Sequence, residues 1–402
     1  MMSASGNRID TLDVLRGFAI LGILIMNIQA FAHVSTGYVN PTLTGPMTGS
    51  DFWIWLASHA LAEYKFITIF SALFGAGIVL MSDRTAAAGI DPWLRHRRRM
   101  LALGVIGFAH ATLLWYGDIL LLYAIVGMVA FRFRNANVEK LLIWAAVFYL
   151  VPMAFAFAMT GVLHLIPQDT YQELVQEMWQ LDGSVVAAEI AAYQGSYAEQ
   201  FSHRIETLAE AYLWMVLTEE GWRTLAMMLA GMAAYRSGLL SGDFPAAGYG
   251  RLALVGFGIG VPLALWGAMY NVMHDWEMRQ SLYMGRQFNG LAAPLVALGW
   301  GGLVVFVLKK GWLTGLMARF RALGKMALTG YLLTTVICTW IFYGYGLGLF
   351  GTLNRQGQLV VVLAVWLVLL TAAPLWLRWF RMGPVEWLWR WATYGERPPL
   401  RR

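Results

Sequence analysis

The chain is poor in charge and almost without cysteine. Only 13% of its 402 residues are charged, whereas 59% are hydrophobic, and the mean hydropathy is positive. These proportions exclude an ordinary soluble domain and are typical of a polytopic membrane protein in a lipid bilayer. The single cysteine, Cys338, lies within an apolar run, so the sequence offers neither a disulfide framework nor a cysteine metal site, and we expect no metal.

Basic residues are missing from one loop and crowded into the next. The loop 34–52 contains no lysine or arginine, whereas the connection 83–99 contains five arginines. Short loops rich in lysine and arginine stay in the cytoplasm, so we place 83–99 inside. The same alternation continues along the chain and predicts two cytoplasmic termini. The net charge of +6 therefore reports topology, and we expect no nucleic-acid binding because the basic residues fall in short clusters between apolar runs.

Apolar windows of about 20 residues, the length that crosses a bilayer, recur along the whole chain. They cover residues 14–33, 64–82, 99–116, 119–135, 138–162, 218–237, 249–272, 287–308, 325–348 and 357–378. The first window lacks a small-residue cleavage site after it, so we interpret it as a retained span. The sequence predicts an all-α, polytopic bundle of about ten transmembrane helices. Without an internal repeat or linker, residues 1–402 are expected to form a single transmembrane domain.

Three segments have the composition of surface helices. Residues 163–206 contain seven acidic residues against Arg204 alone, which indicates an acidic extracytoplasmic segment. The aromatic stretch 51–66 suits a helix at the outer interface. Residues 381–402 contain GPVEWLWRW, with a proline that can start a helix and tryptophans spaced for an interface, so we expect a cytoplasmic interfacial tail.

A histidine and an aspartate occur in the apolar stretch GFAHATLLWYGDILLLYAIVG, residues 107–127. His110 follows Arg98 by twelve residues, which is about 18 Å along a helix and reaches just past the membrane midplane. A residue at this depth is either a structural hydrogen-bonding group or a base or proton carrier. Asp118 is either the N-cap of the next helix or, if a turn at Gly117 folds it back, the partner of His110.

Five motifs together resemble the YeiB-like family of bacterial inner-membrane proteins, end to end and in order. They are RIDTLDVLRGFAILGILIMNIQAF (8–31), KFITIFSALFGAG (65–77), GFAHATLLWYGDILLLYAIVG (107–127), KMALTGYLL (325–333) and RMGPVEWLWRWATYG (381–395). Such proteins are similar to the transmembrane acyltransferases, a group that includes heparan-glucosaminide acetyltransferase. The resemblance implies a multi-pass protein of the inner membrane, a homodimer, and transfer of an acetyl or other acyl group from cytoplasmic acyl-CoA to an acceptor.

The resemblance also implies where the catalytic groups lie. Many relatives carry a histidine at the end of the first span, where this sequence has Asn27. His110 is then the only histidine inside a family motif, and it is expected to be the base, with Asp118 fixing the imidazole tautomer. Asn27, Lys65 and Trp115 are expected to position or polarise the reacting groups. Lys65 has an alternative role, in which its side chain simply reaches the outer surface.

Arginines near the cytoplasmic face are candidates for binding the phosphates of acyl-CoA. Arg97, Arg98 and Arg99 begin the helix that carries His110, although such runs also act as plain topology signals. Arg16 lies three residues after Asp13, so it forms either an ion pair at the helix end or a phosphate contact.

The predicted function is transfer of an acyl group to a hydroxyl or amine of a glycan, lipid or small molecule at or across the membrane. The main alternative is a proton-coupled transporter or flippase, in which His110 and Asp118 carry protons. Glycine-bearing runs at 73–77 and 256–262 can supply the broken helices of that class, or fit close helix packing. A third alternative is a membrane scaffold with structural polar groups. A tunnel from the arginine-rich face to His110 would distinguish the acyltransferase from the other two.

Overall fold

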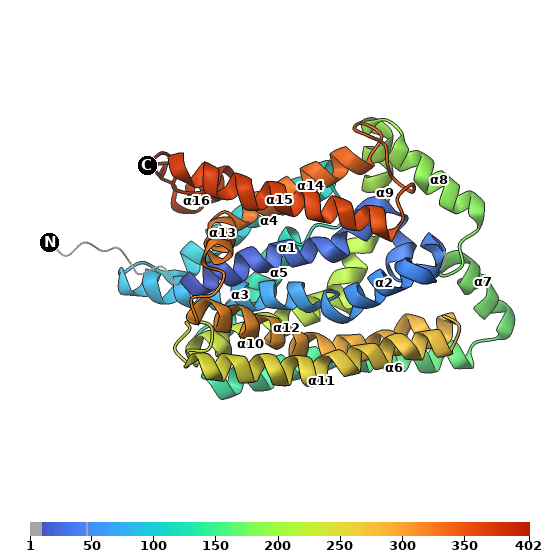
Figure 1. Ribbon diagram of the computed structural model, residues 1–402, viewed down its shortest axis with the longest axis horizontal. Helices are drawn as coiled ribbons and strands as arrows, with labels where there is room; N and C mark the ends of the chain where they lie inside the picture. Colours follow the sequence, from blue (N-terminus) through green and yellow to red (C-terminus); the bar gives the residue numbers. More distant parts are fainter. Residues whose placement is uncertain (1–9, 46) are drawn as a thin grey trace.

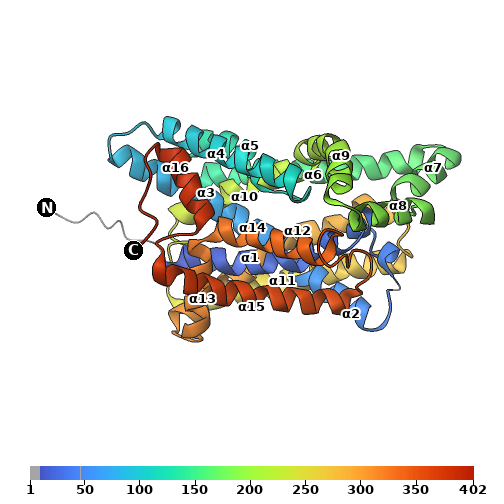
Figure 2. The ribbon, with the colours of Figure 1, turned by 90° about the horizontal axis from the view of Figure 1, so that it is seen from above.

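The protein is described by a computed structural model covering residues 10–45 and 47–402, within which there is no β-strand. The side chains of residues 207, 209–211 and 213–218 lie outside this description, as do Arg8 and Ile9 of the first motif. The remaining chain forms a bundle of long helices (Figures 1 and 2). The predicted all-α membrane fold is confirmed, and the protein is a multi-pass membrane protein.

The helices are numbered along the chain, with short 3-10 turns after α1 and α5 and a π-helical turn before α12. Their bounds are α1 Asp10–Ala32, α2 Gly49–Leu61, α3 Lys65–Ala87, α4 Pro92–Leu113, α5 Leu120–Ala130, α6 Val138–Leu165, α7 Gln168–Met178, α8 Gly183–Gln194, α9 Tyr197–Thr218, α10 Glu220–Arg236, α11 Ala246–Met273, α12 Arg286–Lys309, α13 Thr314–Lys325, α14 Ala327–Phe342, α15 Arg355–Trp379 and α16 Pro384–Tyr394.

Each of the ten apolar windows coincides with a helix, namely α1, α3, α4, α5, α6, α10, α11, α12, α14 and α15. Six helical segments of the described chain are long and apolar enough to cross a membrane by themselves, and the bent pair α13–α14 would give a seventh. The count of ten stays a prediction. The window 325–348 was too long, because α14 ends at Phe342 and meets α13 at an angle of 90°.

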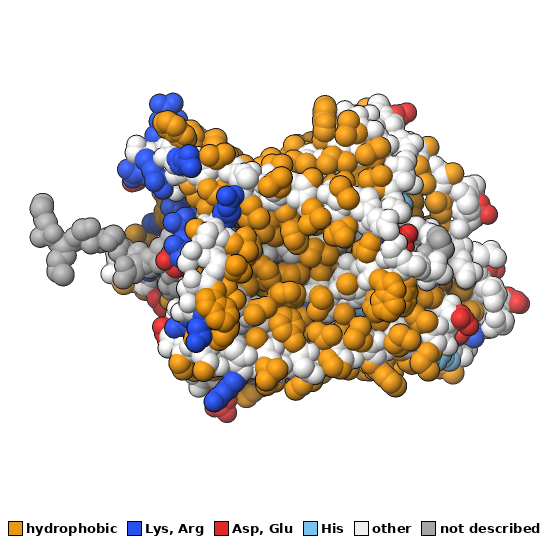
Figure 3. Space-filling view, viewed as in Figure 1, with side chains coloured by type: hydrophobic (Ala, Val, Ile, Leu, Met, Phe, Trp, Pro, Cys, Tyr) orange, Lys and Arg blue, Asp and Glu red, His pale blue; other side chains and the backbone are white. Residues whose placement is uncertain are grey.

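Charged side chains separate toward the two ends of the bundle. Lysine and arginine gather at the end where the C-terminus and α16 lie, and acidic side chains occur at the opposite end near α7 and α8 (Figure 3). Between them lies a broad belt of hydrophobic side chains, the surface that lipid covers. The acidic segment 163–206 forms α7, α8 and the start of α9. We call the two ends the basic end and the acidic end.

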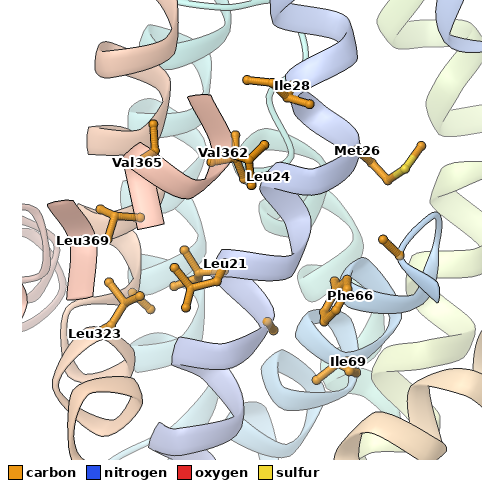
Figure 4. Close-up of a cluster of buried hydrophobic side chains, with 14 of the residues drawn as sticks. Leu21, Leu24, Met26, Ile28, Phe66, Ile69, Leu323, Val362, Val365 and Leu369 are labelled. Atoms are coloured by element: carbon orange, nitrogen blue, oxygen red, sulfur yellow. The ribbon is translucent and has the colours of Figure 1, made fainter. Parts of the chain in front are cut away.

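Helix α1 lies at the centre of the largest hydrophobic core. Its Leu21, Leu24 and Ile28 contribute to the same buried cluster as Val362 and Val365 of α15 (Figure 4). Phe66 and Ile69 of α3 join this cluster, as does Leu323 of α13. The core holds α1, α3, α13 and α15 together and leaves the polar groups of α4, α5 and α14 beside it.

Candidate active site

The hairpin between α4 and α5 places the first polar group of the site. Gly107 of α4 allows the two helices to touch, because a Cβ there would lie 2.3 Å from the backbone nitrogen of Leu121. After α4 ends at Leu113, the chain turns and Asp118 returns toward His110. One Asp118 oxygen, Oδ2, accepts a hydrogen bond from the Leu121 N–H at 2.8 Å. Asp118 therefore satisfies the start of α5 and faces the histidine at the same time.

The second polar group is a buried hydrogen-bonded chain through the imidazole of His110. Its Nδ1 lies 2.7 Å from Oδ1 of Asp118, and its Nε2 lies 3.0 Å from the hydroxyl of Thr335 on α14. A neutral imidazole beside an ionised carboxylate would donate from Nδ1 to Asp118 and accept at Nε2 from Thr335. His110 and Asp118 are both 2% exposed. The sequence placed Asp118 near His110 only conditionally, and the structure brings them together.

Helix α9 holds this turn from the acidic end. Arg204 is fully buried and donates from Nε to the carbonyl of Thr112 and from Nη1 to the carbonyl of Leu114, both at 2.9 Å. These are the unsatisfied carbonyls at the end of α4, which a cation stabilises. The hydroxyl of Tyr212 donates to Oδ2 of Asp118 at 3.0 Å. Neither Arg204 nor Tyr212 was identified as a site residue from the sequence, although a lone arginine in an acidic segment indicates a specific contact.

A cavity of about 420 Å³ lies beside the pair, toward the acidic end, and we call it the polar cavity. Asn27, Trp115 and Asp118, three of the residues singled out from the sequence, line it. Trp115 stacks on Phe31 with ring centroids 4.0 Å apart, and its indole nitrogen has no hydrogen-bond partner in the described chain. His110 is absent from the lining of this cavity, so Asp118 is the member of the pair that reaches it.

The polar cavity also contains an ionic cluster that the sequence did not reveal. Glu219 is 2.6 Å from Arg223, and its other oxygen is 3.9 Å from Arg286. Arg286 also donates to the hydroxyl of Tyr64, and Glu220 lies beside Arg223 at 3.9 Å. These residues come from α10, α12 and the junctions before α3 and α10, so only the tertiary fold assembles them. Their signal in the sequence was charge inside the apolar window 218–237 and directly before the window 287–308.

A second cavity, of about 210 Å³, lies at the basic end and we call it the basic cavity. Arg16, Arg99, Lys325 and Arg390 line it, with Glu386 as the acidic member. Arg16 also makes the expected ion pair with Asp13, at 2.9 Å. Arg99 lies 4.5 Å above the ring of Trp389 from the C-terminal tail.

The other two arginines of the expected run lie elsewhere. Arg97 and Arg98 are exposed and are absent from the lining of the basic cavity. Of the three consecutive arginines, the structure therefore brings only Arg99 to this cavity.

Tyr331 of α14 lines both the polar cavity and the basic cavity. Its ring centroid lies 5.2 Å from that of His110, and Thr335 follows one helical turn later. The two cavities therefore meet at one side chain, which lies against the histidine of the buried pair. The motif KMALTGYLL contained this tyrosine, but its spacing gave no reason to select it.

Lys65 belongs to a different cluster. It is fully buried, so the alternative in which it reaches the outer surface is wrong. Its Nζ donates to the carbonyl of His59 at 2.8 Å and to the side chain of Asn289. Glu63 lies 2.5 Å from Nδ1 of His59 and accepts from Asn289 at 3.0 Å. None of the four lines the polar or the basic cavity.

Comparison with known proteins gives matches along the entire chain. Residues 234–396 match a family described as a protein of unknown function (DUF418). The uncharacterized protein YeiB of Escherichia coli (strain K12) is 36% identical over 391 residues, covering 97% of each chain.

Two relatives from Bacillus species also match over nearly their full length. The uncharacterized protein YxaH of Bacillus subtilis (strain 168) is 34% identical, covering 98% of this chain and 96% of that protein. An uncharacterized 39.9 kDa protein in the amylase 3' region of Bacillus acidopullulyticus is 25% identical, covering 99% and 97%. No solved structure matches.

Proposed function

The chain belongs to the YeiB-like family, and we propose that within it this protein is a transmembrane acyltransferase of the bacterial inner membrane. It transfers an acetyl or other acyl group from cytoplasmic acyl-CoA to a hydroxyl or amine of an acceptor in the polar cavity. The observation that carries the proposal is the shared wall at Tyr331, where a cationic cavity and a carboxylate-bearing cavity meet beside the His110–Asp118 pair.

The basic cavity suits the donor. Arg16, Arg99, Lys325 and Arg390 place cationic side chains around one opening at the basic end, and phosphates are bound by such groups through field and hydrogen bonds. The donor's thioester then lies toward Tyr331, away from the cations. With the basic end in the cytoplasm, as loop charge predicts, the donor enters from the compartment that holds acyl-CoA.

The polar cavity suits the acceptor. The acceptor oxygen or nitrogen loses its proton to the His110–Asp118 pair, of which Asp118 contacts the cavity, and attacks the thioester carbonyl. The carbon–sulfur bond breaks, and the coenzyme A thiolate takes the proton back. Tyr331, Trp115 and Asn27 are the donors placed to stabilise the oxyanion. Thr335 contacts Nε2, the imidazole nitrogen on the side of the ring away from Asp118.

The test uses full-length protein in liposomes with acyl-labelled acetyl-CoA and a search for label on protein, lipid, glycan or small acceptor. Wild-type protein is expected to transfer label, and His110→Ala is expected to lower transfer per folded molecule about 10²–10⁴-fold. Label transfer that is equal in the two proteins contradicts the role of the pair. Absence of transfer by wild type contradicts the enzyme and favours a transporter.

The transporter alternative draws on the same two cavities, because a barrier between opposite openings is also the geometry of alternating access. The described helices lack the breaks that the sequence suggested for a transporter. The glycine-bearing runs 73–77 and 256–262 lie inside α3 and α11, which continue through them. The sharp break in the described chain lies instead between α13 and α14 at the basic end.

A further inference from the structure

A third cavity, of about 370 Å³, lies between α3, α10 and α12, and we call it the apolar cavity. Its lining is almost entirely hydrocarbon, and the polar side chains on it are those of Thr68, Ser237 and Tyr249. An empty cavity of this size destabilises a protein because the lining loses its packing partners. Water would find too few polar partners there to be held. The chemistry of the lining therefore favours a hydrocarbon occupant over water.

The apolar cavity reaches the lipid-facing surface of the bundle. Two of its lining side chains, Leu142 of α6 and Leu298 of α12, are 52% and 45% exposed. In a membrane protein such apolar side chains face acyl chains rather than water. The occupant can therefore enter sideways from the bilayer, between α6 and α12.

One edge of the cavity lies at the basic end. Tyr249 is on its lining, and Nζ of Lys309, the last residue of α12, lies 5.9 Å from the centroid of the Tyr249 ring. Ser237 lines the same cavity directly after α10 ends. A cation at the end of an apolar slot between transmembrane helices matches the two parts of an anionic lipid, because the head group and acyl chain are joined.

We propose that the apolar cavity is a lipid-binding site, which takes one acyl chain of an anionic phospholipid from the surrounding bilayer and holds its phosphate at Lys309. This site is separate from the proposed acyl transfer. The apolar and basic cavities share the lining residue Leu73, which is 2% exposed and stands between them. The proposed lipid is a bound component of the fold and neither donor nor acceptor, and competition with palmitoyl-CoA tests this separation.

The probe is phosphatidylglycerol with a photoreactive diazirine in its acyl chain, added to phosphatidylcholine vesicles that contain the full-length protein. Peptides from α10 and α12 are expected to carry the cross-link. Gly301→Phe fills the cavity, since Gly301 lines it and an added Cβ meets no atom within 4 Å. This variant is expected to lose labelling severalfold. Gly258→Phe is the matched control, because it has equal free space on α11 but lies outside the cavity.

Ala230→Leu, also on the lining, is the second variant if Gly301→Phe fails to fold. Lys309→Gln is expected to remove the preference for labelled phosphatidylglycerol over labelled phosphatidylcholine. Labelling that is unchanged in both cavity variants, or spread evenly over all lipid-facing helices, overturns the proposal. Displacement of the probe by palmitoyl-CoA but not by unlabelled phosphatidylglycerol also overturns it, because the cavity would then belong to the acyl donor. Acyl-transfer activity is measured separately and does not enter this result.

Discussion

Two buried pairs of histidine and carboxylate can be compared within this molecule. His110 and Asp118 lie 2.7 Å apart, and His59 and Glu63 lie 2.5 Å apart. The first pair contacts hydroxyls from Thr335 and Tyr212, and its aspartate lines the polar cavity.

The second pair has different surroundings. Asn289 contacts both of its members and also accepts from the ammonium of Lys65, and the pair lies away from the polar and basic cavities. The pairing itself is nearly the same at both places. Access to a cavity, rather than the presence of a buried titratable pair, distinguishes a candidate active site from a structural polar cluster.

The largest expected effect is on catalysis, at Asp118. Asp118→Asn keeps an oxygen that can accept from Leu121 N–H, but it removes the charge that fixes the His110 tautomer. We expect label transfer to fall about 10²–10⁴-fold with little change in melting temperature. Asp91→Asn is the matched control, because Asp91 caps α4 by accepting from Trp93 N–H at 2.9 Å. An equal loss of label transfer in the two variants would show that Asp118 acts only as a helix cap.

The second expected effect is on stability, at Lys65. Lys65→Met removes the ammonium and leaves two buried acceptors, the carbonyl of His59 and the side-chain oxygen of Asn289, without their donor, and each such loss costs about 1–3 kcal/mol. Transfer per folded molecule should stay at the wild-type value. The measurement combines chemical denaturation with label transfer normalised to folded protein. A large loss of transfer at unchanged stability would place Lys65 in the reacting machinery instead.

The difference between the clusters explains what could be predicted from sequence. Hydropathy located the helices, and local spacing placed Asp118 near His110 because both lie in one hairpin. Lys65 was harder, since its partner Asn289 is 224 residues away and nothing local reports a buried ammonium. Tyr331 and Thr335 could not be selected either, because the packing of α14 against α4 brings them to the histidine.

The third expected effect is on label transfer, at Tyr331, which lines both the polar and the basic cavity. Tyr331→Phe removes one hydroxyl without changing the packed ring. A neutral hydrogen bond contributes about 0.5–1.5 kcal/mol, so transfer should fall by up to about tenfold. Tyr343→Phe is the control, because Tyr343 is also buried but lies outside both cavities. The rates of the two variants are compared at saturating acetyl-CoA, and similar rates would remove Tyr331 from the site.

The smallest effect concerns the helix that carries Tyr331 and Thr335. Glu386 of helix α16 accepts hydrogen bonds from the N–H groups of Leu328 and Thr329, at 2.6 and 3.1 Å, and so caps α14. Burial raises the pKa of the Glu386 carboxyl above its ordinary 4.5. The folded protein then holds this proton more tightly than the unfolded chain. Stability from this group is present below pH 4.5 and is lost as the pH rises through the raised value.

Glu386→Gln keeps an accepting oxygen and cannot titrate, so the melting temperature of the variant should fall less than that of wild type as pH rises from about 4.5. At the acidic end, the pKa of Glu199 is shifted in the opposite direction, so its effect on stability has the opposite pH dependence. Hydrogen bonds from Ser196 lower the pKa of Glu199, so Glu199→Gln should reduce the loss of stability as pH falls below 4.5. Melting curves across this range decide both cases. If Glu386→Gln follows wild type at every pH, the cap on α14 is independent of charge, and the position of Thr335 beside His110 depends on packing alone.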